Sequence, residues 1–390
     1  MDLNTDSITE CLELASGADL VVVQREAAAH PFASRLHEFT RRNRIPLIFD
    51  LDDLLLFLPR LHPDRQAQVF SEALLPIFRL LMESDAVTVC SYQLKQLVEV
   101  LNPCTYVLPN YIDDTAWEIR EHPRTSDTVR IIYLGTQSHR SDLAEIQPAI
   151  LQALRVLGDK ARFEIVGFAP NDSLRPLALE DNVIFDQFFE YDYLKFVRKA
   201  NKIYAHIGIA PLSNNLFNRS KSMLKLLEYT CMGLAGIYSN VQPYSDEVHS
   251  RGSGLLVSSI EEWIDGILTL AKDETLRLSI VRAARERLQD FRLSVHAQSW
   301  ERQIEEVAEL ASDASRRAQS VNWQLLLKTL ESIDVQLHER CDSLHSRREA
   351  AEAALEEERR RSREMEAALE EERRRSREME AALEEERRRS

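Results

Sequence analysis

Short runs rich in valine, isoleucine and leucine alternate with helical stretches through residues 18–310 of this chain. A run such as ADLVVVQ at residues 18–24 has no polar face, which is typical of a buried strand in a parallel sheet. Strands that alternate with helices predict a doubly wound α/β fold. The expected strands are residues 18–24, 45–49, 85–90 and 106–108 in a first set, and residues 129–134, 163–166, 183–185, 205–210, 236–239 and 254–257 in a second.

The two sets of strands predict two Rossmann-like domains, one at residues 1–124 and one at residues 125–311. Helices are expected between the strands, and three helical stretches close the second domain. The expected helices are residues 31–43, 71–83 and 222–232, followed by residues 260–272, 274–291 and 294–310.

The rest of the chain is dominated by charged residues. Residues 312–348 predict a helical linker with the start of a coiled coil, and residues 349–390 predict a helix that repeats the sequence EEERRRSREMEAAL. Leu330, Leu337 and Leu344 begin a heptad frame that runs to the last residue without a slip, as a coiled coil requires. Many Glu–Arg pairs at i,i+4 spacing can also hold a helix in water without a partner. Both a lone helix and a weak coiled coil stay open, so this segment could act as a spacer or oligomerise the protein.

Charge and cysteine content exclude several classes of function. The formal net charge of −15 argues against a nucleic-acid groove, because phosphate binding needs clustered Lys and Arg. The five cysteines are scattered without CxxC spacing, so they predict neither a metal site nor a disulfide framework. No segment resembles a membrane span or a signal peptide. We expect a cytoplasmic location, with peripheral contact at the inner face of a membrane left open.

Residues 218–240, NRSKSMLKLLEYTCMGLAGIYSN, predict a helix, a glycine stop and a strand. Ser220 or Ser222 would cap the start of the helix. Glu228 falls inside the helix, and Gly233 lies where a helix end needs a left-handed residue. The strand at residues 236–239 follows at once.

This arrangement resembles the signature of family-4-like GT-B glycosyltransferases, in which a Glu, seven residues and a second Glu precede a small residue and Gly. Glu228 matches the second Glu, which in that family accepts hydrogen bonds from the ribose hydroxyls of a nucleotide sugar. Ser220 stands in place of the first Glu, at the position that normally contacts the donor sugar. The resemblance therefore places Glu228, Ser220 and the adjacent Tyr229 in a donor site.

Two lysines lie near the start of the same expected helix. A helix N-terminus favours phosphate through its free N–H groups and its dipole, and a lysine there adds a mobile positive charge. Lys221 and Lys225 resemble the lysine-rich variant KSxxKxxEYxxxG, which occurs in glycosyltransferases of surface-polysaccharide pathways. The resemblance implies that both lysines contact the diphosphate.

Residues 133–142, YLGTQSHRSD, resemble the first strand and turn of the nucleotide-binding domain in this family. Gly135 and Thr136 match the turn, and His139 and Arg140 are the candidate cationic contacts of the diphosphate. Residues 166–167 match the end of the next strand, and residues 290–310 resemble the terminal helices that cross back to the N-terminal domain.

The first domain carries four candidate acceptor-side residues that follow expected strands. They are Arg25, Asp52, Asp53 and Asn110. Compared with the family, no glycine-rich strand–loop–helix unit precedes residue 18. We therefore expect either a reduced N-terminal domain or a chain that is a piece of a longer protein, with an incomplete acceptor side.

The resemblance implies transfer of a sugar from a nucleotide diphosphate sugar to a glycan or lipid-linked acceptor. It also implies a retaining reaction without metal or other cofactor, in which Lys225, Lys221 and Arg140 stabilise the leaving diphosphate. The alternative is a non-catalytic scaffold, in which the charged helix is the working part and binds a second copy or a partner protein. An epimerase or phosphorylase is disfavoured, because neither extra acid–base carboxylates nor a phosphate or pyridoxal site is evident.

Overall fold

The computed structural model describes residues 8–25, 27, 33–123, 127–188, 190, 192–248, 252–312 and 323–389. Residues 31 and 32 of the first expected helix and residues 313–322 of the expected linker lie outside this part of the chain. The chain divides into two compact units, Met1–Ile333 and Asp334–Ser390, and each is described by itself.

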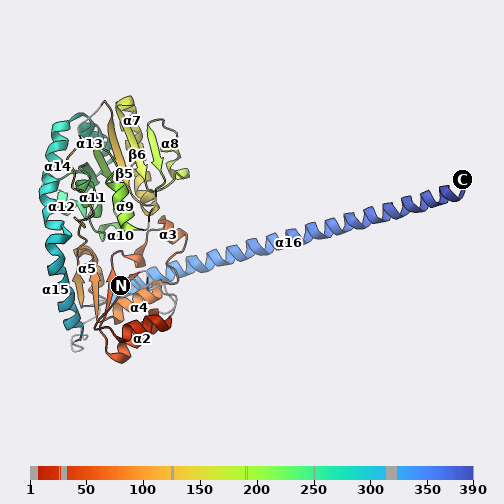
Figure 1. The fold of residues 1–390 in the computed structure, drawn as a ribbon, viewed down its shortest axis with the longest axis horizontal. Coiled ribbons are helices and arrows are strands. Elements are labelled where there is room, and N and C mark those ends of the chain that lie inside the picture. Colours follow the sequence, from red (N-terminus) through yellow and green to blue (C-terminus); the bar gives the residue numbers. More distant parts are fainter. Residues whose placement is uncertain are drawn as a thin grey trace. The chain divides into compact units, whose positions relative to one another are not determined.

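Four parallel strands form the first sheet, in the order β1-β2-β3-β4, within the red to orange part of the chain in Figure 1. They are β1 (Val21–Gln24), β2 (Leu47–Leu51), β3 (Ala86–Val89) and β4 (Thr105–Val107). The elements packed around them are α1 (Ile8–Ser16), α2 (Ala33–Asn43), η2 (Leu55–Phe57), α3 (Pro63–Gln66), α4 (Leu74–Glu83) and α5 (Tyr92–Val98). All four residues of β3 are buried, which explains why that run contains no charged residue.

Six parallel strands form the second sheet, in the order β10-β9-β8-β5-β6-β7. They are β5 (Val129–Leu134), β6 (Ala161–Val166), β7 (Val183–Asp186), β8 (Ile207–Ala210), β9 (Ala235–Ser239) and β10 (Leu255–Val257). The chain starts in the middle at β5, builds outward to β7, and then returns to β8 on the other side of β5. The strand order therefore reverses between β5 and β8, which is where ligands bind in open α/β sheets.

Helices cover both faces of the second sheet. They are α6 (Arg140–Glu145), α7 (Gln147–Leu157), α8 (Arg175–Ala178), α9 (Tyr193–Ala200), α10 (Leu216–Arg219), α11 (Leu224–Cys231), α12 (Tyr244–Val248), α13 (Ile260–Lys272) and α14 (Glu274–Leu288). Along β5, Ile131 belongs to the core on one face and Ile132 to the core on the other. The two parallel sheets and the covering helices confirm the expected doubly wound α/β fold, with strand boundaries moved by a few residues.

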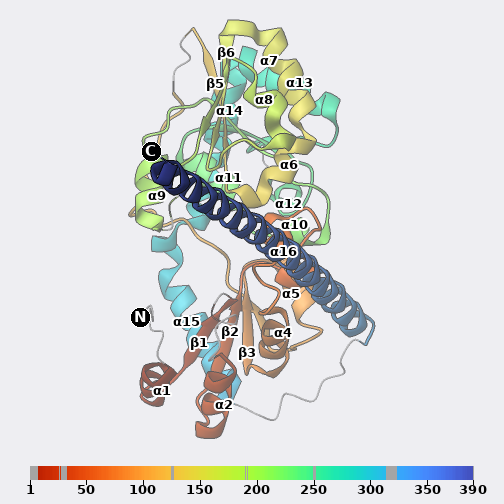
Figure 2. The same ribbon diagram turned by 90° about the vertical axis from the view of Figure 1, so that its right-hand side faces the viewer.

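The end of the second domain returns to the first. η6 (Gln289–Phe291) leads into α15 (Leu293–Ser312), and Ile112 exchanges backbone hydrogen bonds of 2.8 Å with Phe291 and Leu293. Val307 of α15 packs against Ile48 and Ala86 of the first sheet, and Figure 2 shows α15 running along that sheet. The expected crossing of the terminal helices is therefore present.

The last helix, α16 (Trp323–Arg389), is 67 residues long. At the standard rise of 1.5 Å per residue, this corresponds to about 100 Å. Its first turns belong to the first unit, where Ser332 Oγ donates a hydrogen bond of 2.7 Å to the carbonyl oxygen of Leu56 in η2. No helix in the described part of the chain is long and apolar enough to cross a membrane.

Candidate functional site

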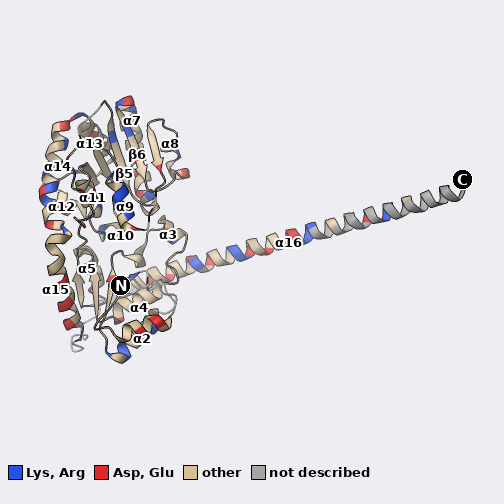
Figure 3. Ribbon diagram, viewed as in Figure 1, with Lys and Arg blue, Asp and Glu red and all other residues tan. Residues whose placement is uncertain are grey.

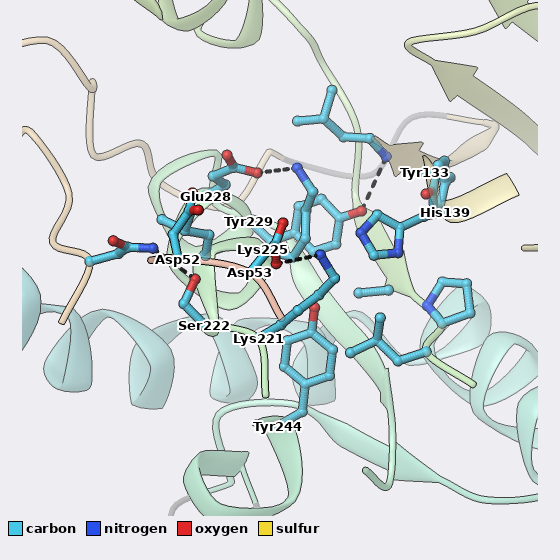
Figure 4. Close-up of a pocket in the computed structure, with 16 residues that line it drawn as sticks. Asp52, Asp53, Tyr133, His139, Lys221, Ser222, Lys225, Glu228, Tyr229 and Tyr244 are labelled. Atoms are coloured by element: carbon cyan, nitrogen blue, oxygen red, sulfur yellow. Dashed lines mark hydrogen bonds and ion pairs between the residues drawn. The ribbon is translucent and has the colours of Figure 1, made fainter. Parts of the chain in front are cut away.

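A cavity of about 200 Å³ lies at the reversal point of the second sheet, where loops of the first domain also meet it (Figure 4). Its walls come from the ends of β5 and β8, the start of α11, and the loops after β2 and β4. The lining residues are Asp52, Asp53, Asn110, Tyr133, Leu134, His139, Ala210, Pro211, Leu212, Lys221, Ser222, Leu224, Lys225, Glu228, Tyr229 and Tyr244.

Helix α11 places Glu228 and Lys225 in the cavity on adjacent turns. Lys225 donates through Nζ to Glu228 Oε2 at 2.5 Å, and the Glu228 side chain is only 11% exposed. The helix stops as expected, because Gly233 has a φ of 72° and a Cβ there would lie 2.5 Å from the carbonyl oxygen of Glu121. The ion pair fixes the direction of a carboxylate that keeps a second oxygen for a ligand.

The start of α11 differs from the expectation. The helix begins at Leu224 after Met223, and no side chain caps it, so the predicted serine cap is wrong. Ser222 instead accepts a hydrogen bond of 2.9 Å from Asn110 Nδ2 of the first domain. Ser220 is 1% exposed and donates through Oγ to the carbonyl oxygen of Leu216, and it does not line the cavity. The Ser220 hydroxyl is therefore directed at the turn that precedes it.

Lys221 is held by the first domain. Its Nζ lies 2.9 Å from Asp53 Oδ1 (Figure 4). Asp53 also accepts a hydrogen bond from Arg25 NH1 at 2.9 Å. Burial alone would raise the pKa of Asp53, but Lys221 and Arg25 outweigh it and hold that pKa below its ordinary value. Asp53 is therefore a charged bridge between a cation of each domain.

Asp52 lies beside this bridge, with Oδ1 at 3.0 Å from Arg25 NH1. Burial raises the pKa of Asp52, and the positive charge of Arg25 opposes that rise only in part. The carboxyl ends of β1 and β2 thus bring together Arg25, Asp52 and Asp53, as expected for neighbouring parallel strands. Arg25 itself supports the carboxylates and is not among the residues that line the cavity.

The turn after β5 contributes one of its candidate residues to the cavity. His139 lines it, and His139 Nδ1 lies 2.7 Å from Asp142 Oδ2. Asp142 also accepts from the backbone N–H of Ser213 at 2.9 Å, so the orientation of the imidazole is fixed. Burial, followed by the positive charge of Lys221, lowers the pKa of His139.

The other three candidates in this turn are not cavity-lining residues. The guanidinium of Arg140 lies 5.1 Å from the centre of the Phe168 ring, in a cation–π contact. Thr136 Oγ1 is hydrogen-bonded to Ser138 Oγ at 2.6 Å. Gly135 permits close packing, because a Cβ there would lie 2.5 Å from the Tyr133 hydroxyl.

Tyr229 is completely buried beneath the cavity. Its hydroxyl donates to the carbonyl oxygen of Ile209 at 2.8 Å and accepts from the backbone N–H of Leu134 at 3.2 Å. These bonds join β8 to β5 at the reversal point. The sequence analysis assigned this residue to donor binding, whereas the geometry gives its hydroxyl a role in holding the floor of the cavity.

Several lining residues were missed by the sequence analysis. Tyr133 and Leu134 are in β5, Ala210 is the last residue of β8, and residues 211 and 212 directly follow it, so the end-of-strand positions could have signalled them. Tyr244 is 3% exposed and also contributes to the wall. Asp142, which orients His139, gave no distinct signal, because an acidic residue in the first turn of a helix is common. Among the described residues, no group of three or more His, Cys, Asp or Glu side chains is placed to hold a metal ion.

No protein-family model and no curated protein matches this sequence. Solved structures do match. A sucrose-phosphate synthase from Thermosynechococcus elongatus is 16% identical with a TM-score of 0.55, and the match covers 77% of this chain and 76% of that one. Anabaena HepE in complex with UDP and glucose is 15% identical with a TM-score of 0.57, covering 77% and 81%.

A third similar structure is TarM from S. aureus in complex with fondaparinux, α-GlcNAc-glycerol and UDP, at 12% identity and a TM-score of 0.53. That match covers 77% of this chain and 58% of TarM. At these levels of identity the likeness shows the fold, and the fold is GT-B.

Proposed function

We propose that this chain transfers a sugar from a nucleotide diphosphate sugar to a glycan or lipid-linked acceptor. The observation that carries the proposal is the cavity at the reversal point of the second sheet, where Lys221, Lys225 and Glu228 converge. Residues of both domains line it, as a reaction that joins a donor and an acceptor requires. Two ammonium groups beside a carboxylate suit a ligand that carries both phosphates and a ribose diol.

Glu228 is the proposed ribose-binding residue. One of its oxygens is held by Lys225, which leaves the carboxylate oriented for ribose hydroxyls without the loss of side-chain entropy on binding. Lys221 is the proposed diphosphate ligand, and on donor binding it would exchange Asp53 for a phosphate oxygen. UDP-sugars are the first donors to test, since two of the similar structures hold UDP.

The proposed catalysis is electrostatic. Negative charge builds on the leaving diphosphate as its bond to the sugar breaks, and the lysines stabilise that charge. We propose a retaining reaction that relies on these side chains, and an acceptor in surface-polysaccharide or glycoconjugate synthesis. Arg140 would enter the cavity only if it left Phe168, so it is a less direct candidate than either lysine.

Calorimetric titration with UDP-, GDP-, dTDP- and ADP-sugars tests the donor site. We expect one class of donor to bind the wild type. Glu228→Gln should weaken the binding of that donor roughly tenfold, because it removes one charged hydrogen-bond acceptor. The matched control is Glu164→Gln, which breaks a Glu–Arg130 ion pair on strands β5 and β6, apart from the cavity-lining residues. Equal binding by wild type and Glu228→Gln would contradict the proposed ribose contact.

A non-catalytic scaffold is the second candidate. It is favoured by one observation, namely that the Ser220 hydroxyl is bonded to Leu216 and does not reach the cavity where a donor-sugar contact is expected. Turnover separates the two candidates, because a scaffold that binds UDP releases no product. Tight donor binding without product, over a panel of glycan and lipid acceptors, would favour the scaffold.

A further inference from the structure

Helix α16 carries an exposed apolar stripe from Leu337 onward. On the heptad frame, Leu344, Ala351 and Met365 take position d, and Cys341 and Leu355 take position a, with Arg348 at the a position between them. Leu344 and Leu355 are 48% and 49% exposed, and Met365 is 65% exposed. One unbroken helix carries the frame, so all these positions share one face.

From Ala351 onward the stripe is interrupted with a regular period. The apolar pair Ala351 and Leu355 is followed by the polar core pair Glu358 and Ser362, and the 14-residue repeat then restores an apolar pair. A partner helix must therefore present apolar pairs at the same spacing of 14 residues, or its apolar side chains would face carboxylates. A second copy of this chain has that spacing.

The flanking positions decide the direction of such a pair. In a parallel, in-register pair, each g position faces the e position of the next heptad in the other helix. Every charged pair formed in this way from Arg347 onward joins an arginine to a glutamate, and the alternate g positions are alanines. The pairs are Arg347–Glu352, Arg361–Glu366 and Arg375–Glu380.

An antiparallel pair cannot satisfy both requirements. When apolar pairs are matched, g faces g and e faces e, which sets Arg361 against Arg361 and Glu352 against Glu366. A shift by one heptad removes those like-charge contacts but sets Leu355 against Glu372. Figure 3 shows the alternating basic and acidic blocks along the described part of α16 that produce this constraint.

We propose that residues 334–390 bind the same segment of a second copy of this chain as a parallel, in-register coiled coil. The association is weak, because Arg348 faces its own copy at an a position, and Glu358 and Glu372 each face theirs at d positions. Many intrahelical pairs, such as Arg361 with Glu357 at 3.1 Å, keep the helix formed in the separated chains. The proposal does not depend on the proposed enzymatic function.

Cys341 reports on the register. It is exposed on the helix, and in a parallel, in-register pair its sulfur lies beside that of the second copy. Mild oxidation with copper phenanthroline is expected to give a covalent dimer of the full-length chain on a non-reducing gel, and Cys341→Ser should abolish it. In that background, Leu344→Cys at d should restore the dimer, whereas Ser346→Cys on the outer face should not.

Charge reversal tests the direction independently of any disulfide. The triple variant R347E/R361E/R375E should weaken dimerisation roughly tenfold or more, because it sets like charges opposite each other at every paired g and e position. Adding E352R, E366R and E380R should restore it. The matched control R360E/R374E changes charge on the outer face and should leave the dimer intact.

Sedimentation equilibrium over a range of protein concentrations measures these effects. A monomeric wild type at all concentrations, or crosslinking equal in Leu344→Cys and Ser346→Cys, would overturn the proposal. So would a triple variant that dimerises as well as the wild type. A stable dimer in which Cys341 does not crosslink would point to another register and contradict the in-register pairing.

Discussion

Tyr229→Phe separates the structural role of this residue from donor binding. The change removes only the hydroxyl, which is fully buried and joins the carbonyl oxygen of Ile209 to the backbone N–H of Leu134. Each lost bond costs about 1 kcal/mol in net terms, and both backbone groups stay buried without a partner. We therefore expect the free energy of unfolding to fall by about 2 kcal/mol.

Urea unfolding followed by tryptophan fluorescence measures this loss. The matched control is Tyr238→Phe, because Tyr238 is equally buried and its hydroxyl has no hydrogen bond among the described residues. We expect the control to change stability by less than about 0.5 kcal/mol. Donor affinity should stay within about twofold of wild type, since the aromatic ring still fills the cavity floor. A tenfold loss of donor affinity with unchanged stability would refute this reasoning and restore Tyr229 as a direct donor contact.

Three further predictions follow from glycine geometry, pKa and charge. Gly167→Ala should lower the free energy of unfolding in urea by roughly 3 kcal/mol or more, because φ is 130° and a Cβ would lie 1.9 Å from a backbone carbonyl oxygen. The control Gly158→Ala should lower it by about 1 kcal/mol, because φ is 54° there and the Cβ would enter open space. The pKa of His139 is lower in the folded protein than in the unfolded chain, so the unfolded chain takes up the proton first as pH falls. The stabilisation by neutral His139 is therefore complete above the pKa of the unfolded chain and is lost as pH falls below about 6.5. Urea unfolding at several values between about pH 7.5 and about pH 5 should therefore show a shallower pH dependence of stability in His139→Asn than in wild type. An identical slope would contradict the assignment. Asp53→Asn should tighten UDP binding roughly three- to tenfold in calorimetric titration, since it removes the charge that holds Lys221, and weaker binding would show that Asp53 organises the site.

Local sequence determined the parts of this protein that depend on neighbouring residues. The β-branched runs fixed the strands, because a strand buried on both faces has only apolar positions to offer. Gly233 fixed the end of α11, because few residues other than glycine tolerate a left-handed backbone against the carbonyl oxygen of Glu121. The sequence also placed Glu228 and Lys225 in the same site, because residues three apart on one helix are neighbours on its surface.

Tertiary structure decided the parts that depend on side chains meeting across the chain. Lys221 and Asp53 are 168 residues apart and belong to different domains, so no local pattern could pair them. The expected roles of Arg140 and Ser220 rested on their position in a motif, whereas packing directs one to Phe168 and the other to Leu216. A motif specifies the backbone path near a site, but each side chain then adopts the rotamer with the best available partner. Which of the motif residues line the cavity was therefore decided by the loops that the fold brings to the reversal point of the sheet.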